Sequence, residues 1–482
     1  MQTRTVGLLA KQVWRNTVKN RSTIWLFGVF NLLLLCALLS GYQYMHSQQL
    51  LALENSEEVR ERWVNNPDKH PHRMAHYGYV AFRQKYPLSF FDFGMDSYVG
   101  NVIFLEAHRQ NTVNFSAASL SNGLLRLGEI SAGMVLQLLV PLLLFFWGFS
   151  LVASEREKGT LKIVLIQNVS AVELIAGRAL GLFYLSTVVF LPTAIIGGIL
   201  LGLSDLGLTS IGLYGRFILL LIAYVFYFGL LSWLAVLISA YSSSSRASLI
   251  RLIGCWLFFT LMLPKVSQLV GQTLYPAPTK IEFDTAVEEE LIQHGDSHNP
   301  NDPHFQALKD SLLRAYGVES PQELPFNYSG YVMREGEKLS AETYQRHQEN
   351  LVGIYQKQQQ VVRLTAMLNP YLAIKNLSMA FSGTDYSAFK DFQEQTETYR
   401  YTLAQTMNEL QIQHISNKVE SSADKKAIIS RQHWEDLPDF QHQFLSLGQV
   451  IRQESISIIS LMVWGLGLFL VTNRFAQHLK AF

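Results

Sequence analysis

Six stretches of the chain are almost continuously apolar over about 19 residues or more, the length that crosses a ~30 Å hydrocarbon core as an α-helix. They comprise residues 24–42, 132–153, 179–203, 211–239, 252–270 and 455–473. The first, second and last contain no Asp, Glu, Lys or Arg. One such charge at a helix centre costs about 2.5–3.5 kcal/mol on insertion scales, so these runs are typical of membrane spans. The pattern predicts a mainly α, polytopic membrane protein with six transmembrane helices.

The polar segments between the spans predict the orientation. If the N-terminus is cytosolic, segments 1–23, 154–178, 240–251 and 474–482 are cytosolic too, and together they carry 13 Lys and Arg but three acids. The other two long segments, 43–131 and 271–453, carry 24 basic and 33 acidic residues. Basic residues in short loops favour the cytosolic side. We therefore expect both termini in the cytosol and a large domain outside.

The N-terminal 23 residues precede the first span and are basic. Leu8, Leu9, Val13 and Trp14 alternate there with Lys11, Arg15, Lys19 and Arg21, which favours an amphipathic surface helix; a basic flank that only sets orientation is the alternative. The leader is long and lacks a small-residue cleavage site, so we interpret residues 1–42 as this helix plus an uncleaved anchor. Cys36 and Cys255 both fall in spans, which argues against structural disulfides outside.

The two outer segments are expected to form one mostly helical domain. Apolar positions recur every three or four residues from Tyr344 to Leu368, up to Asn369-Pro370, and again from Phe389 to Leu410. This spacing predicts two long helices, joined by a shorter one, that pair as a hairpin. Farther on, Trp434 and its apolar neighbours are expected to dock on the same domain rather than on a partner.

Motifs for several kinds of chemistry are missing from the sequence. There is no Gly-x-x-x-x-Gly-Lys-Ser/Thr loop, no Gly-x-Ser-x-Gly elbow and no zinc-protease motif, so ATP hydrolysis would need a partner subunit and an enzyme is disfavoured. Histidines cluster at His70, His72 and His76 and at His294, His298 and His304. Pro71 and the absence of a paired Cys weaken a metal site there, and we interpret these histidines as solvated or locally bonded.

A few polar residues lie in or near the spans. Arg216 and Lys265 are expected to snorkel to the interface or pair there, and Asp205 is a candidate partner of Arg216. The pairs Gly177/Gly181 and Gly198/Gly202 have the spacing that permits close helix contact.

The segment Ser154-Glu-Arg-Glu-Lys-Gly-Thr-Leu-Lys162 lies between spans 2 and 3, and its pattern continues through Val169, Ser170, Glu173, Gly177 and Arg178. Polar residues alternate there with an apolar stripe, as in a helix at the membrane surface. This motif, the six spans and the basic N-terminal helix resemble the permease subunits of type-2 ABC exporters. The large insertions 43–131 and 271–453 resemble an uncharacterised subgroup of that family.

The resemblance implies specific roles. The segment near 154–176 would be the coupling helix that enters a groove on the ATPase, with Glu155, Arg156, Glu157, Lys158, Gly159, Thr160 and Glu173 as contact residues. Spans 2 and 5 would line the pathway, with Gln137, Ser150, Trp256 and Thr260 as candidate lining positions; simple packing between helices is the alternative. Val169 stands where the family often has proline.

The expected protein is therefore the permease of an ATP-driven transporter in the bacterial inner membrane, exporting or extracting a substrate. Its expected partners are two ABC ATPase subunits, which would bind ATP and magnesium, a second permease half, the bilayer, and possible periplasmic proteins, but no nucleic acid. No cofactor or metal is expected in this chain itself. Two other readings stay open: a mechanical transmitter that acts on a periplasmic partner, and a membrane-anchored binding protein. The regions 132–270 and 454–482 would then form the membrane part with residues 1–42.

Overall fold

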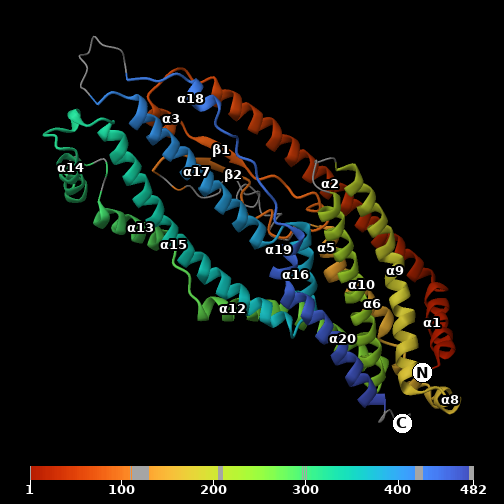
Figure 1. The fold of residues 1–482 in the computed structure, drawn as a ribbon. Helices are drawn as coiled ribbons and strands as arrows, with labels where there is room; N and C mark the ends of the chain where they lie inside the picture. Colours follow the sequence, from red (N-terminus) through yellow and green to blue (C-terminus); the bar gives the residue numbers. More distant parts are fainter. Residues whose placement is uncertain are drawn as a thin grey trace.

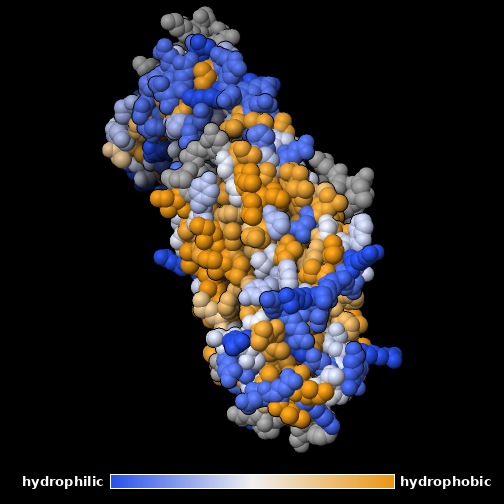
Figure 2. Space-filling view, turned by 90° about the vertical axis from the view of Figure 1, so that its right-hand side faces the viewer, coloured by the Kyte–Doolittle hydropathy of each residue, from blue (hydrophilic) through white to orange (hydrophobic). Residues whose placement is uncertain are grey.

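The computed structural model describes residues 2–108, 110, 130–204, 210–295, 297, 299, 301–417 and 427–476. Asp205 and His298, two residues singled out in the sequence, lie outside this described part. The described chain forms an elongated molecule with a helical bundle at one end and a hydrophilic domain at the other, which we call the head domain (Figure 1). On the face shown in Figure 2, a broad apolar belt covers the bundle between two more hydrophilic regions.

Within the described part of the chain, six helical segments are long and apolar enough to cross a membrane, which confirms the predicted fold class. They are α2 (Arg21–Val64), the broken helix Ala132–Glu157, α9 (Ala171–Leu203), α10 (Ser210–Tyr241), the segment Ser245–Leu274, and α20 (Ser455–Ala476). The protein is a mainly α, multi-pass membrane protein. Both ends of the described chain lie at the end of the bundle farthest from the tip of the head domain (Figure 1).

The second and fifth spans are each interrupted by a π-helical turn. The second comprises α5 (Ala132–Met134), the π turn η2 (Val135–Leu139), α6 (Val140–Gly148) and α7 (Ala153–Glu157); the fifth comprises α11 (Ser245–Leu257), the π turn η3 (Phe258–Met262) and α12 (Leu263–Leu274). Pro141 and Pro264 are the second residues of the helices that follow the two turns. Proline cannot donate the next helical hydrogen bond, so a wider turn before it is physically reasonable.

The first span extends well beyond the predicted residues 24–42. Helix α2 runs for 44 residues without a break, from the bundle far into the head domain (Figure 1). The apolar run in the sequence marks only the part of this helix that is apolar enough to cross the membrane. The polar continuation keeps good helix formers and has no proline until Pro67, so nothing local ends the helix earlier.

The head domain combines both long polar segments of the chain. The first contributes α3 (Pro71–Tyr77) and the antiparallel strands β1 (Tyr79–Phe82) and β2 (Val102–Leu105), which pair Tyr79 with Leu105. The second contributes α13 (Lys280–His294), α14 (Pro303–Tyr316), the 3₁₀ turn η4 (Pro321–Glu323), α15 (Tyr328–Ala366), α16 (Pro370–Ser382), α17 (Tyr386–His414), α18 (Gln432–Glu435) and α19 (Leu447–Gln453). The small sheet is a feature that the sequence analysis missed.

Helices α15 and α17 are the two long helices expected from the apolar spacing, and α16 is the shorter helix between them. They lie side by side along the head domain (Figure 1). Asn369 caps α16 and Pro370 begins it, so the Asn-Pro pair ends one helix and starts the next. Trp434 is fully buried in the head domain, where its carbonyl accepts a hydrogen bond from the Trp63 indole at 3.3 Å.

The amphipathic helix α1 (Thr3–Val18) packs along the beginning of α9. A Cβ atom at Gly177 would lie 2.7 Å from Leu9 Cβ, and one at Gly181 would lie 2.7 Å from Val13 Cβ. The first glycine pair thus permits close contact with α1 rather than between two spans. Gly198 has only ordinary contact with Phe217, at 3.4 Å.

We expect Gly181→Ala to lower the free energy of unfolding by about 1–3 kcal/mol, because the added methyl overpacks the contact with α1. Equilibrium unfolding in mixed micelles measures this change. Gly229→Ala in α10 is the matched control, since nothing lies within 4 Å of its added methyl. Equal effects of the two substitutions would mean that α1 does not pack on α9 as described.

Candidate functional site

The segment between spans 2 and 3 forms a bent protrusion that we call the elbow, residues 153–170. It contains α7, an exposed turn at Lys158, Gly159 and Thr160, and α8 (Leu161–Ile166). Gly159 has φ 73°, a left-handed conformation that glycine adopts at little cost. The single coupling helix expected near 154–176 is therefore two short helices, followed by the start of α9.

The elbow bends a second time at Asn168, next to Val169, the position at which the resembling permease family often has proline. Asn168 adopts φ 64°, one of the few residue types that tolerate this region. The chain then enters α9 through a capping box in which the Ser170 hydroxyl accepts from the Glu173 amide at 3.2 Å and the Glu173 carboxylate accepts from the Ser170 amide at 3.0 Å. The helix break is present although Val169 is not proline.

Four of the predicted coupling residues connect the elbow to neighbouring helices. Glu155 accepts a hydrogen bond from the guanidinium of Arg178 in α9 at 2.5 Å, and Arg156 donates to the Ser242 carbonyl after α10. Glu157 accepts from the Ser245 hydroxyl of α11 at 2.6 Å. Glu173 is buried and accepts from the Gln2 amide at the start of α1. These contacts fix the elbow to three spans and to α1.

The outer face of the elbow is exposed. Lys158, Gly159 and Thr160 are exposed, and two isoleucines of α8 beside them leave 57% (Ile163) and 84% (Ile166) of their surface uncovered. We call these five residues the elbow surface. An apolar pair next to a small polar turn, held rigidly from behind, is suited to contact with a partner surface or with lipid.

Sequence reasoning missed a buried polar cluster where the head domain meets the bundle. Asp92 accepts hydrogen bonds from the Gln137 amide at 2.9 Å and from the Ser378 hydroxyl. Gln137 also donates to the Tyr224 hydroxyl at 2.9 Å, and all four side chains are buried. The sequence signal that could have revealed this cluster is the acidic Asp92 within the otherwise largely apolar run Leu88–Phe93. This cluster connects the loop after β1, span 2, span 4 and α16.

Three of the four candidate pathway residues form side-chain hydrogen bonds within the bundle. Gln137 and Thr260 lie in the two π turns, and Gln137 belongs to the Asp92 cluster. The Trp256 indole donates to the Leu138 carbonyl of η2 at 2.9 Å, and Thr260 donates to the Trp256 carbonyl at 2.7 Å. Ser150 is half-buried next to the elbow.

Both π turns have carbonyls that bind side chains of neighbouring elements. Besides the bond to Leu138, the Phe259 carbonyl of η3 accepts from the Asn369 amide at 2.7 Å. Wider π turns leave carbonyl groups less satisfied within the helix, and such turns occur often at functional sites. These side-chain bonds connect spans 2 and 5 with each other and with the head domain.

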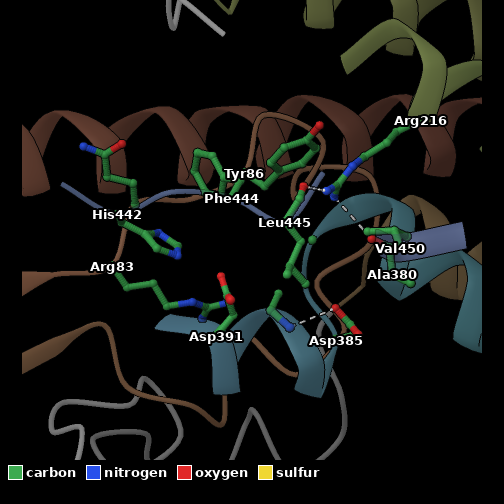
Figure 3. Close-up of a pocket in the computed structure, with 13 residues that line it drawn as sticks. Arg83, Tyr86, Arg216, Ala380, Asp385, Asp391, His442, Phe444, Leu445 and Val450 are labelled. Atoms are coloured by element: carbon green, nitrogen blue, oxygen red, sulfur yellow. Dashed lines mark hydrogen bonds between the residues drawn. The ribbon is translucent and has the colours of Figure 1, made fainter. Parts of the chain in front are cut away.

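Arg216 is placed differently from the sequence expectation. It is buried under the head domain, donates to the carbonyls of Leu445 and Ala380, and its guanidinium lies 4.2 Å from the centre of the Tyr86 ring. Figure 3 shows it at one side of a small pocket, of about 10 Å³, that also contains Arg83 and His442. Arg216 therefore connects α10 with the head domain instead of snorkelling, whereas Lys265 is exposed.

The pocket makes the protein's stability sensitive to pH. Burial and the charge of Arg83 lower the pKa of His442 to about 3. The unfolded chain binds a proton near pH 6.5 and the folded chain does not, so stability is full above pH 6.5 and falls as the pH decreases toward 3. We expect about 2 kcal/mol less stability at pH 5 than at pH 8 from this group.

Unfolding in mixed micelles at pH 8 and pH 5 tests this expectation with His442→Leu, which removes the titrating group and should reduce the pH dependence. The exposed His433→Leu is the control. An unchanged pH dependence in His442→Leu would show that His442 is not held neutral in the folded protein.

Comparison with known families adds one finding. A domain of unknown function, DUF3526, matches residues 280–443, which run from α13 through α18 in the head domain. No curated protein matches the chain. The matching segment covers the long helices α15 and α17 and does not include the elbow or the spans.

Proposed function

We propose that this chain is the permease subunit of an ATP-driven type-2 ABC exporter, with the elbow surface as the docking site for a separate ATPase. The observation that carries the proposal is the elbow itself: Ile163 and Ile166 are exposed, while Glu155, Arg156 and Glu157 fix the same element to α9, α10 and α11. An exposed contact on a rigidly held element transmits a push instead of absorbing it.

The proposed assembly contains two ATPase subunits, which bind ATP and magnesium, and a second permease half. The low burial of the fifth span supports a second permease half. Only 17% of its most apolar window is buried, against 61% for the second span, so a partner could cover the remaining surface. In the proposed orientation, which the basic residues of segments 1–23 and 154–178 support, the elbow and both termini lie in the cytosol and the head domain lies in the periplasm of a bacterium. The chain itself is not an enzyme in this proposal.

ATP-driven closure of the ATPases would move the elbow, and spans 2 and 3 would carry the movement to the head domain. The Asp92 cluster, the Trp256–Leu138 bond and the Arg216 contacts are the described connections along this route. A rocking mechanism would require these contacts to change between two arrangements.

Copurification from native membranes tests the proposal. The wild-type chain should bring down an ATPase with a nucleotide-binding loop. In Ile163→Asp/Ile166→Asp the amount of copurified ATPase should fall at least tenfold, because two charges replace the apolar contact. Ile281→Asp/Ile292→Asp is the matched control, since these two isoleucines of α13 are 78% and 70% exposed in the head domain. Absence of any ATPase with the wild type would leave the membrane-anchored binding protein as the better account.

A second function is favoured by one observation. Helix α2 is continuous from the bundle to the far part of the head domain, so the bundle and the head domain share a rigid rod (Figure 1). Such a rod suits a transmitter that moves a periplasmic partner without transporting a substrate. Glu54→Pro would break the rod at an exposed position, with Glu54→Ala as control. Loss of partner binding with retained ATPase stimulation by substrate would exclude the pure transmitter.

A further inference from the structure

Three histidines of the first head segment meet at one place. His72 and His76 lie one turn apart on α3, and His108 follows β2, which the β1–β2 pairing returns to α3. The ring centres are 4.6 Å apart for His72 and His76, 5.5 Å for His72 and His108, and 5.4 Å for His76 and His108. One nitrogen from each ring lies within 4.8 Å of the other two.

The sequence analysis weighed a metal site here and set it aside because of Pro71 and the absence of a paired cysteine. The structure removes the first objection, because Pro71 is the first residue of α3, where proline is favoured. His70 is the N-cap residue and its ring accepts a hydrogen bond from the His72 amide, so it belongs to the helix start and not to the cluster. The third member, His108, is brought in by the small sheet and could not be found from spacing.

His108 is held in a specific orientation. Its Nδ1 lies 2.9 Å from a carboxylate oxygen of Glu337, and its own amide donates to the same oxygen at 2.8 Å. Its backbone has φ 61°, unusual for a residue other than glycine, so the surroundings determine this conformation. Glu337 is fully buried and forms an ion pair with Arg400 at 2.7 Å.

This arrangement is the one that prepares a histidine to bind a metal. A carboxylate that accepts from Nδ1–H fixes the tautomer, presents the Nε2 lone pair and raises its basicity. Two further imidazoles converge on the same space, and His76 is exposed, which gives an ion access from solvent. Imidazole ligands without thiolates suit Zn²⁺ and its late first-row neighbours.

We infer that His72, His76 and His108 form a binding site for a divalent transition metal, with Zn²⁺ as the expected ion and one coordination position open to water or an anionic ligand. A tetrahedral Zn²⁺ site has nitrogens about 3.3 Å apart, so the rings must close inward by up to about 1.5 Å on binding. Exposed His76 has the freedom to do so. Bound metal would connect α3 and the β hairpin with α15 through Glu337.

The test uses the tag-free full chain in detergent after treatment with a chelator. Competition with a chromophoric chelator should show one Zn²⁺ per chain with a Kd below about 1 μM, and Co²⁺ should give the absorption of a tetrahedral complex. His76→Ala and His108→Ala should each weaken binding at least a hundredfold. Glu337→Gln should weaken it about ten- to a hundredfold while the ligands remain.

The control is His433→Ala, because His433 and His414 form an exposed pair with ring centres 4.5 Å apart but belong to no such group of three among the described residues. It should leave the affinity unchanged. His76→Gln provides a second variant at an exposed position that should fold normally. Absence of saturable binding to the wild type, or equal binding by the His72→Ala/His76→Ala/His108→Ala chain, would overturn the inference. The result is independent of ATPase binding, so it can fail or succeed without deciding the proposed function.

Discussion

Arg400→Met is expected to lower the free energy of unfolding by about 3–5 kcal/mol, because it leaves the buried Glu337 carboxylate without its cation. Arg400 is 1% exposed in α17 and binds Glu337 at 2.7 Å and Glu397 at 2.8 Å. Methionine keeps the apolar stem of the side chain but supplies no charge and no hydrogen-bond donor. The loss therefore reports mainly the ion pairs and less the apolar packing of the stem.

Equilibrium unfolding in mixed micelles, followed by tryptophan fluorescence, measures the effect, since Trp63 and Trp434 are both buried in the head domain. Arg431→Met is the matched control: Arg431 also pairs with a glutamate, but it is 49% exposed and should matter by less than about 1 kcal/mol. Arg400→Met/Glu337→Gln should recover part of the loss because it removes one buried charge. Equal effects of Arg400→Met and Arg431→Met would contradict the described head domain.

Asp96→Asn is expected to cost a similar amount, about 3–5 kcal/mol, for the opposite reason: it leaves two cations buried. Asp96 forms an ion pair with Arg83 at 2.9 Å and accepts a hydrogen bond from Lys85 at 2.8 Å, and all three side chains are nearly inaccessible. The three residues belong to the loop between β1 and β2, which the Gln49 amide also anchors through the Lys85 carbonyl at 2.8 Å. The loop should therefore lose its fixed position on α2.

The stabilisation that Asp96 contributes to the fold decreases at acid pH. Burial alone would raise its pKa, but the neighbouring Arg83 and Lys85 lower it below the usual value. The stabilisation is therefore full above about pH 4, the usual pKa, and is lost as the pH falls through the lower folded value. Asp96→Asn should lack this acid-dependent loss, whereas exposed Asp436→Asn should behave like the wild type. The same acid sensitivity in wild type and Asp96→Asn would mean that other groups determine it.

The spans and long helices could be predicted from the sequence because they depend on local pattern. A bilayer requires about 19 apolar residues per span, and a helix pair requires apolar positions every three or four residues. The helix α2 shows the limit: its apolar run ends near Tyr42, but the helix continues to Val64 because helix length depends on propensity and packing as well.

Contacts between distant segments could not be predicted in this way. Strands β1 and β2 have four residues each, too few for a clear alternating pattern, and they bring His108 to α3. Arg216 looked like an interfacial residue because it lies near a span end, but the head domain covers it. Asp92 and Gln137 lie 45 positions apart, and only the folded chain shows that they bond.

The central claim is that the elbow surface meets an ATPase, and site-specific crosslinking tests it most directly. A photoreactive residue at position 166, where Ile166 is 84% exposed, should crosslink in native membranes to a protein that contains a nucleotide-binding loop. The same photoreactive residue at position 211 should not crosslink to that protein. Ile211 is 87% exposed and lies at the end of α10 that is remote from the elbow. Crosslinks from position 166 to lipid alone, or the same partner from both positions, would contradict the account.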